Sequence, residues 1–237
     1  MAEAESSRAT ASKPRRRMAR QSTDLVETIR SMIANLELPP GSVVSESRLT
    51  KELGCGRTPV REALLILSTE YLIKQVPGLG STVAGLDITD YSFITELQQA
   101  IEPFAARLAA VRITDAELNE LDAVLEEARV AVEAGDIDKI AELNLRFHEK
   151  VLAATRNQYM VDAAMRLNWY SVRFWRFAYS RGVPMMPSIL EHERILQALR
   201  NHDPDEAQKV SHDHWADYLT RFWGREPTAQ PAFDTFG

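Results

Sequence analysis

Hydrophobic residues in the first third of the chain recur at the spacing of short helices. From residue 23 onward leucine and isoleucine return at every third or fourth position, which predicts an amphipathic helix through Leu25, Ile29, Ile33 and Leu36. Pro39-Pro40-Gly41 ends this helix. A second helix is expected to start at Ser45 or Glu46, and a third near Arg57, where Pro59 fits the first turn.

Two short strands follow these helices. Residues 71–75 and 81–84 flank Pro77-Gly78-Leu79-Gly80, a sequence typical of a hairpin. Three short helices and a hairpin predict a winged helix-turn-helix. In that fold the start of the third helix enters the major groove of DNA, and the wing approaches the backbone or the minor groove.

The second half of the chain predicts helices up to about residue 223, with recognisable start and stop signals. Thr114 and Glu117 form a capping box, Gly135 ends the helix that follows, and Asp136 begins another. Further helices are expected at about 158–179, after Ser188 with Glu191 as a cap, and after Asp203-Pro204. Six helices with apolar stripes predict an all-α bundle.

We therefore predict a mostly α fold with four segments. These are a disordered basic tail (1–20), a winged helix-turn-helix domain (21–86), an all-helical effector and dimerisation domain (90–223) and a flexible tail (224–237). The basic run of the first tail either touches phosphates or is simply solvated.

Charge supports the division. Residues 1–88 hold 12 Lys and Arg against 10 Asp and Glu, a net charge of +2. The rest of the chain has a net charge of −8, which gives −6 for the whole chain. This asymmetry suggests a nucleic-acid module joined to an acidic one. The single cysteine excludes an intrachain disulfide, and no apolar run is long enough to span a bilayer, so we expect a cytoplasmic protein without a membrane partner.

The predicted third helix carries a specific motif. Arg57-Thr58-Pro59-Val60-Arg61-Glu62-Ala63-Leu64, preceded by Pro40-Gly41-Ser42 and by residues 46–56, resembles the DNA-binding signature of the GntR family of regulators. The resemblance implies that Arg57, Thr58 and Arg61 contact DNA, with Gly80 at the wing tip. Cys55 and Gly56 stand where the family commonly has Val and Ser, so one phosphate contact of a serine is missing.

Other interpretations of these basic residues remain open. Arg57 and Arg61 lie four apart and share a helix face, from which an arginine can bind guanine in bidentate fashion. Either could instead grip only phosphate, or pair with Glu62 or Glu46. Arg48 and Lys51 are further DNA candidates, or else part of a solvated face.

Histidines are the candidate chemistry of the second half. Asn144 and His148 lie on one helix face, and His192 and His214 fall on two later helices. Three imidazoles and an amide oxygen suit zinc or another first-row divalent ion. The alternative is that these histidines are surface residues or satisfied core residues.

A second resemblance concerns the same region. Glu96 through Arg107, Asn144 through His148, Glu191-His192 and Asp203 through His214 are similar to the FCD effector domain of the FadR branch of the GntR family. It implies a divalent metal, zinc with nickel or manganese as alternatives, held by Asn144, His148, His192 and His214. Asn144 stands where the family usually has Asp. His212 lies about 200° around the helix from His214 and points elsewhere, and His202 falls in a turn.

The resemblance also implies a small effector. FCD domains usually hold a carboxylate with an arginine of their first helix, and this chain has Gln98 in that region. Arg173 could supply the cation instead, with Trp169 lining the same cavity, which favours an anionic effector. The alternative is that the aromatic residues of this helix are core and its arginines, including Arg176, lie on the surface.

These observations predict a homodimeric transcription regulator that binds a double-stranded, near-palindromic operator and responds to the effector. A metal sensor, in which the ion itself is the signal, is the alternative. A metal-dependent hydrolase would need a general base, and Glu149 is followed by Lys150 and Val151 rather than by an H-E-x-x-H pattern. We therefore expect a protein that is not an enzyme.

Overall fold

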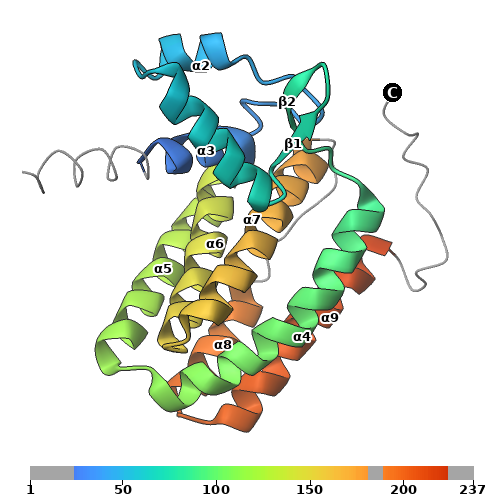
Figure 1. The fold of residues 1–237 in the computed structure, drawn as a ribbon. Coiled ribbons are helices and arrows are strands. Elements are labelled where there is room, and N and C mark those ends of the chain that lie inside the picture. Colours follow the sequence, from blue (N-terminus) through green and yellow to red (C-terminus); the bar gives the residue numbers. More distant parts are fainter. Residues whose placement is uncertain (1–23, 181–188, 224–237) are drawn as a thin grey trace, which may run out of the picture. The chain divides into compact units, whose positions relative to one another are not determined.

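The computed structural model describes residues 24–180 and 189–223 (Figure 1). The chain divides into two compact units, Met1–Leu86 and Asp87–Gly237. The predicted tails at 1–20 and 224–237, and the predicted cap Ser188, lie outside the described residues. No helix within the described ranges is both long and apolar enough to cross a membrane.

Three helices and a hairpin make up the described part of the first unit. The first helix covers residues 24–34, so the prediction that it continues through Leu36 is wrong: Leu36 lies in the turn that follows, with a positive φ of 62°. In α2 (Glu46–Glu52) the side chain of Ser45 accepts a hydrogen bond from the backbone N–H of Arg48, as an N-cap does. The following helix, α3 (Arg57–Thr69), begins at Gly56, which offers no side-chain cap, and buries its apolar face through Val60, Ala63, Leu64 and Leu67.

The hairpin forms one or two residues away from its predicted place. Strands β1 (Ile73–Val76) and β2 (Gly80–Val83) pair antiparallel, with Ile73 opposite Val83 and Val76 opposite Gly80. Tyr71, predicted as the strand start, instead has a positive φ of 60° in the turn that follows α3. Gly78 and Gly80 have φ values of 79° and 91°, which glycine adopts without strain, so the tight wing turn depends on them.

The second unit contains six helices in its described part, as predicted. They are α4 (Ile88–Arg112), α5 (Asp115–Ala134), α6 (Ile137–Ala154), α7 (Gln158–Ser180), α8 (Ile189–Arg200) and α9 (Pro204–Trp223). The capping box of Thr114 and Glu117 is present, Gly135 ends α5 in the left-handed conformation, and Asp136 caps α6. The predicted fold class, a winged helix-turn-helix followed by a helical bundle, is confirmed.

Helix α4 is central to the bundle. It packs along α9 and also contacts α6, α7 and α8, while α5 packs on α6 and α8 (Figure 1). Its inner face carries Ala105, Ala106, Ala109 and Ala110, all buried, and such small side chains let helices approach closely. The bundle interior also contains an unusual set of buried polar side chains, which come from five helices: Gln98, Glu102, His148, Asn168, Ser171, Arg173, His192 and His214.

Candidate metal centre and DNA-binding surface

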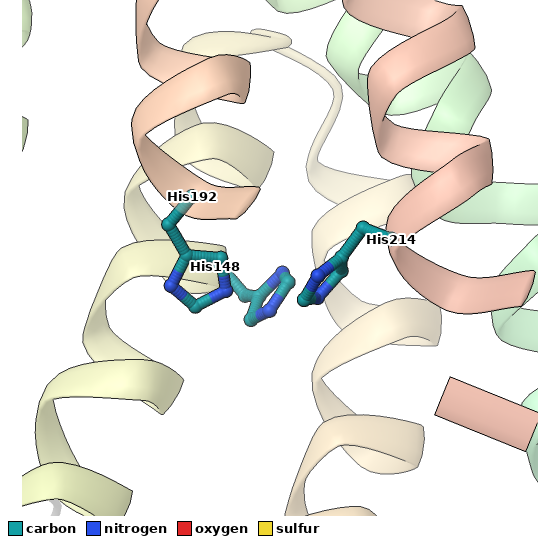
Figure 2. Close-up of side chains that lie close together, drawn as sticks. All are labelled: His148, His192 and His214. Atoms are coloured by element: carbon teal, nitrogen blue, oxygen red, sulfur yellow. The ribbon is translucent and has the colours of Figure 1, made fainter. Parts of the chain in front are cut away.

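Three of the predicted metal ligands meet inside the bundle. His148 lies on α6, His192 on α8 and His214 on α9, and all three are buried. One ring nitrogen from each lies within 4.8 Å of the corresponding atoms of the other two. Figure 2 shows the three rings turned toward a common point. Residues up to 66 positions apart in the sequence therefore form one cluster of nitrogen donors.

Burial keeps two of these imidazoles neutral. It lowers the pKa of His192 well below 6.5, and the neighbouring His214 and His148 lower it further. Burial also lowers the pKa of His214, against the opposing effect of Glu191. A neutral imidazole keeps one nitrogen lone pair, which is the form that binds a metal ion.

Neighbouring side chains hold the rings in place. Nδ1 of His214 lies 2.8 Å from Oε2 of Glu191, so an Nδ1–H that donates to this carboxylate leaves the lone pair on Nε2. The ring of Phe147 stacks on that of His192 at a centroid distance of 4.5 Å. Nε2 of His192 is buried and has no hydrogen-bond partner among the described residues. A bound ion would satisfy this buried nitrogen.

The donor set fits a divalent transition metal. Three imidazole nitrogens suit zinc, nickel and other first-row ions, whereas calcium and magnesium prefer oxygen ligands. Asn144 lies one helical turn before His148 on α6 and is half-buried. Its role as a fourth ligand, and the identity of the metal, stay predictions. The other two histidines are exposed: His212 faces away from the cluster, and His202 contacts the carbonyl of Ala110 through Nδ1.

One residue of this region was missed by the sequence analysis. Glu102 of α4 is only 3% exposed, and its Oε2 lies 3.7 Å from Nδ1 of His148. Its Oε1 accepts a hydrogen bond of 3.0 Å from Nδ2 of Asn168. The available signal was its position four residues after Gln98, which places both on one face of the helix.

The predicted effector residues lie on α4 and α7. Gln98 is fully buried, donates to Oδ1 of Asn168 at 2.6 Å and accepts from the hydroxyl of Ser171 at 2.9 Å. Both polar groups of Gln98 therefore already have partners in the bundle. Trp169, on the same helix α7, is half-buried.

Two arginines of α7, Arg173 and Arg176, do not lie on the surface. Arg173 is fully buried, and its guanidinium lies 5.9 Å from the ring centroid of Tyr170. Burial lowers the pKa of Arg173 to about 10, so the side chain is still cationic at neutral pH. The side chain of Arg176 is also largely buried and pairs with Asp138. The alternative that placed these arginines on the surface is wrong.

The predicted DNA-binding residues lie at the start of α3 and around it. Arg57 and Thr58 are exposed in its first turn. Arg61 is also exposed and pairs with Glu46, with Nε 2.7 Å from the carboxylate. Arg48 pairs with Glu52 at 2.8 Å, and Gly80 opens β2 next to the wing turn. An exposed ion pair is worth about 1 kcal/mol or less, so DNA phosphates can compete for either arginine.

Comparisons with known proteins match both units. The family described as bacterial regulatory proteins, gntR family, matches residues 21–83, and the FCD domain matches residues 94–217. The HTH-type transcriptional repressor RspR of Escherichia coli K12 is 27% identical over 186 residues, which cover 78% of this chain and 82% of RspR. A protein of Paenarthrobacter nicotinovorans, named as a D-xylose utilization operon transcriptional repressor, is 29% identical over 187 residues, or 79% and 82% of the two chains.

The fold is also shared with a solved structure. The structure of E. coli McbR/YncC aligns with 84% of this chain, and the alignment covers 95% of the McbR/YncC chain. The TM-score is 0.75 and the sequence identity is 22%. This likeness concerns the fold alone. The two units therefore occur together, in the same order, in a structure that has been determined.

Proposed function

This chain belongs to the GntR family of bacterial regulatory proteins and carries an FCD domain, and on that basis we propose that it is a transcription repressor controlled by a small anionic effector. The effector binds beside a divalent metal in the helical domain and changes the affinity of the winged helix-turn-helix for its operator. The family makes the chain a DNA-binding regulator and not an enzyme. RspR and the D-xylose relative, both named repressors, support the sign of regulation.

The observation that carries the metal is the convergence of His148, His192 and His214 within the region that matches the FCD domain. An amide and three imidazoles fill only part of an octahedral coordination sphere. Open positions on the ion could take oxygen atoms of an effector.

The anionic character of the effector is supported by Arg173. A buried guanidinium that stays protonated at neutral pH attracts a carboxylate, and it lies on the helix that also carries Asn168 and Ser171. A sugar acid carries such a carboxylate. A neutral sugar such as D-xylose, suggested by the name of one relative, is the competing class.

We further propose that α4 is a dimer interface. Phe93, Leu97, Phe104 and Val111 are 48–66% exposed, and their spacing of four, seven and seven residues puts them on one face of the helix. We propose that a second copy of this chain covers this face. A two-fold axis through the middle of α4 places the acidic start of one α4 helix against the basic end of the other. The charged residues involved are Asp90, Glu96 and Arg107, of which Arg107 also pairs with Asp205 of its own chain.

One experiment tests the regulator as a whole. Operator sequences are first selected from random DNA with the purified protein. DNA affinity is then measured by fluorescence anisotropy in the presence of zinc alone, of each sugar acid or D-xylose alone, and of zinc together with each of these compounds. We expect a near-palindromic site and an affinity that changes only when an acid and zinc are both present. The His148→Ala, His192→Ala variant should bind DNA normally but ignore the acid. Failure to select any sequence would contradict the proposal.

The same measurement distinguishes a metal sensor. In a metal sensor the histidine cluster reports the ion itself, so zinc alone would change DNA affinity and no organic acid would be needed. Binding to chromosomal DNA also requires the protein to act in the bacterial cytoplasm.

A further inference from the structure

We infer that Glu102 supplies the negatively charged oxygen of the metal site, the charge that Asn144 cannot provide. Oε2 of Glu102 binds the ion together with the three histidines, while Oε1 stays on Asn168. This inference rests on the proposed metal site and adds an anionic ligand from a helix that carries none of the predicted ligands.

The first argument is the burial of Glu102. The side chain is 3% exposed, and no lysine or arginine of the described ranges forms an ion pair with it. A buried carboxylate without a cation is costly, because the charge loses its hydration and gains little in return. A dication among His148, His192 and His214 would supply the missing positive charge.

The second argument is the distance between Glu102 and His148. Their facing atoms, Oε2 and Nδ1, are 3.7 Å apart, which is too long for a hydrogen bond. Two atoms bound to one ion at about 2.1 Å each lie roughly 3 to 4 Å apart. The observed spacing therefore suits two ligands of one ion better than a direct pair.

The third argument is the way Glu102 is held. Nε2 of Gln98 donates to Oδ1 of Asn168, and Nδ2 of Asn168 in turn donates to Oε1 of Glu102. This chain presents an N–H donor to the carboxylate, which stabilises its ionised form. It also leaves the second oxygen, Oε2, facing the histidines.

The arrangement explains how a site with Asn144 can still bind a dication. An amide oxygen is neutral, so a set of three imidazoles and an amide leaves the charge of the ion uncompensated. With Glu102 the donor set becomes three nitrogens and one anionic oxygen. Gln98 then acts by positioning Asn168 and through it Glu102.

The test uses four forms of the full-length protein: the natural chain, Glu102→Gln, Asn144→Asp and the double variant. Zinc is removed by chelation, and zinc affinity is then measured by competition with a chromophoric indicator. We expect Glu102→Gln to weaken zinc binding by roughly 10- to 100-fold. We expect Asn144→Asp in the same chain to restore most of the loss, because it returns a carboxylate to the site. Glu133→Gln, an exposed acid of α5, is the matched control and should bind zinc normally.

A second readout separates a ligand from a residue that only supports the fold. Cobalt(II) replaces zinc, and the visible absorption of the cobalt reports its ligands. Glu102→Gln should change this spectrum and Glu133→Gln should not. Unchanged zinc affinity and an unchanged cobalt spectrum in Glu102→Gln would overturn the inference while leaving the histidine site in place. Absence of zinc binding by the natural chain would overturn the proposed metal site and this inference together.

Discussion

Glu191 and His214 come from different helices, α8 and α9, and the carboxylate of the first lies 2.8 Å from Nδ1 of the second. Glu191 directly precedes His192 in the sequence. One turn of α8 therefore contributes both a candidate ligand and the group that orients another candidate ligand. The pairing of a carboxylate with a histidine is typical of metal sites, where it selects the tautomer and strengthens the ligand.

This relationship predicts that Glu191→Gln weakens zinc binding by roughly 10-fold or more. The amide accepts a weaker hydrogen bond from Nδ1–H, so His214 becomes less well oriented and less basic. Competition with a chromophoric indicator measures the change. Glu193→Gln is a suitable control, because Glu193 lies on the same helix but pairs with Arg129. Equal zinc affinity in the natural chain and in Glu191→Gln would show that the pair does not serve a metal.

DNA recognition is predicted to depend on Arg57 and Arg61. Replacing either with Ala should cost on the order of 1–3 kcal/mol of binding free energy on a selected operator, because each removes a contact at the start of α3. Fluorescence anisotropy on operator and on unrelated DNA measures both affinity and specificity. Arg166→Ala removes the same charge from an exposed position on α7 and should have little effect. A folded double variant with full operator affinity would refute the assignment.

Self-association is predicted to depend on the exposed face of α4. Leu97→Glu with Phe104→Glu places two charges on each copy of the proposed interface, and burying them without partners is unfavourable. We expect sedimentation to give the mass of a dimer for the natural protein and the mass of a monomer for the variant. Val130→Glu, on the exposed side of α5, should remain dimeric. A natural protein that sediments as a monomer, with and without DNA, would exclude the dimer.

The pair of Glu117 and Arg156 predicts a pH-dependent contribution to stability. Two hydrogen bonds from Arg156, at 2.6 and 2.7 Å, join the start of α5 to the chain just after α6. They lower the pKa of Glu117 from 4.5 to about 2, against the opposing effect of burial and with further help from the backbone of Thr114. Because the pKa is lower in the folded state, the stabilisation is fully present above pH 4.5 and is lost as the pH falls toward 2.

The test is urea unfolding of the natural chain and of Glu117→Gln at several pH values. Glutamine can keep the capping box, so the substitution removes mainly the charge. We expect the variant to be less stable by about 0.5–1 kcal/mol at pH 7, since the pair is partly exposed, and this difference should shrink between pH 4.5 and 3. Glu149→Gln, an exposed acid of α6, is the control. A difference that is the same at pH 3 and pH 7 would contradict the prediction.

The sequence by itself determined the ends of α5 and the start of α6, because caps act between residues at most a few positions apart. Thr114 with Glu117, Gly135 and Asp136 were all identified correctly. It also predicted the order of the two domains, since the motif of α3 lies in one continuous stretch. Strand ends in the wing were less accurate, because the register depends on which residues pair across the hairpin, as Ile73 does with Val83.

The tertiary structure decided what the buried polar residues do. Periodicity could put Asn144 and His148 on one face, but only the packing of α6, α8 and α9 brings His192 and His214 within reach of His148. Local spacing could place Glu102 on the same helix face as Gln98 but could not show what it contacts, because its partners lie 46 and 66 positions away. The burial of Arg173 was likewise left open by the sequence. A helix pattern defines the direction of a side chain around its own axis, and only the neighbouring helices determine what that side chain meets.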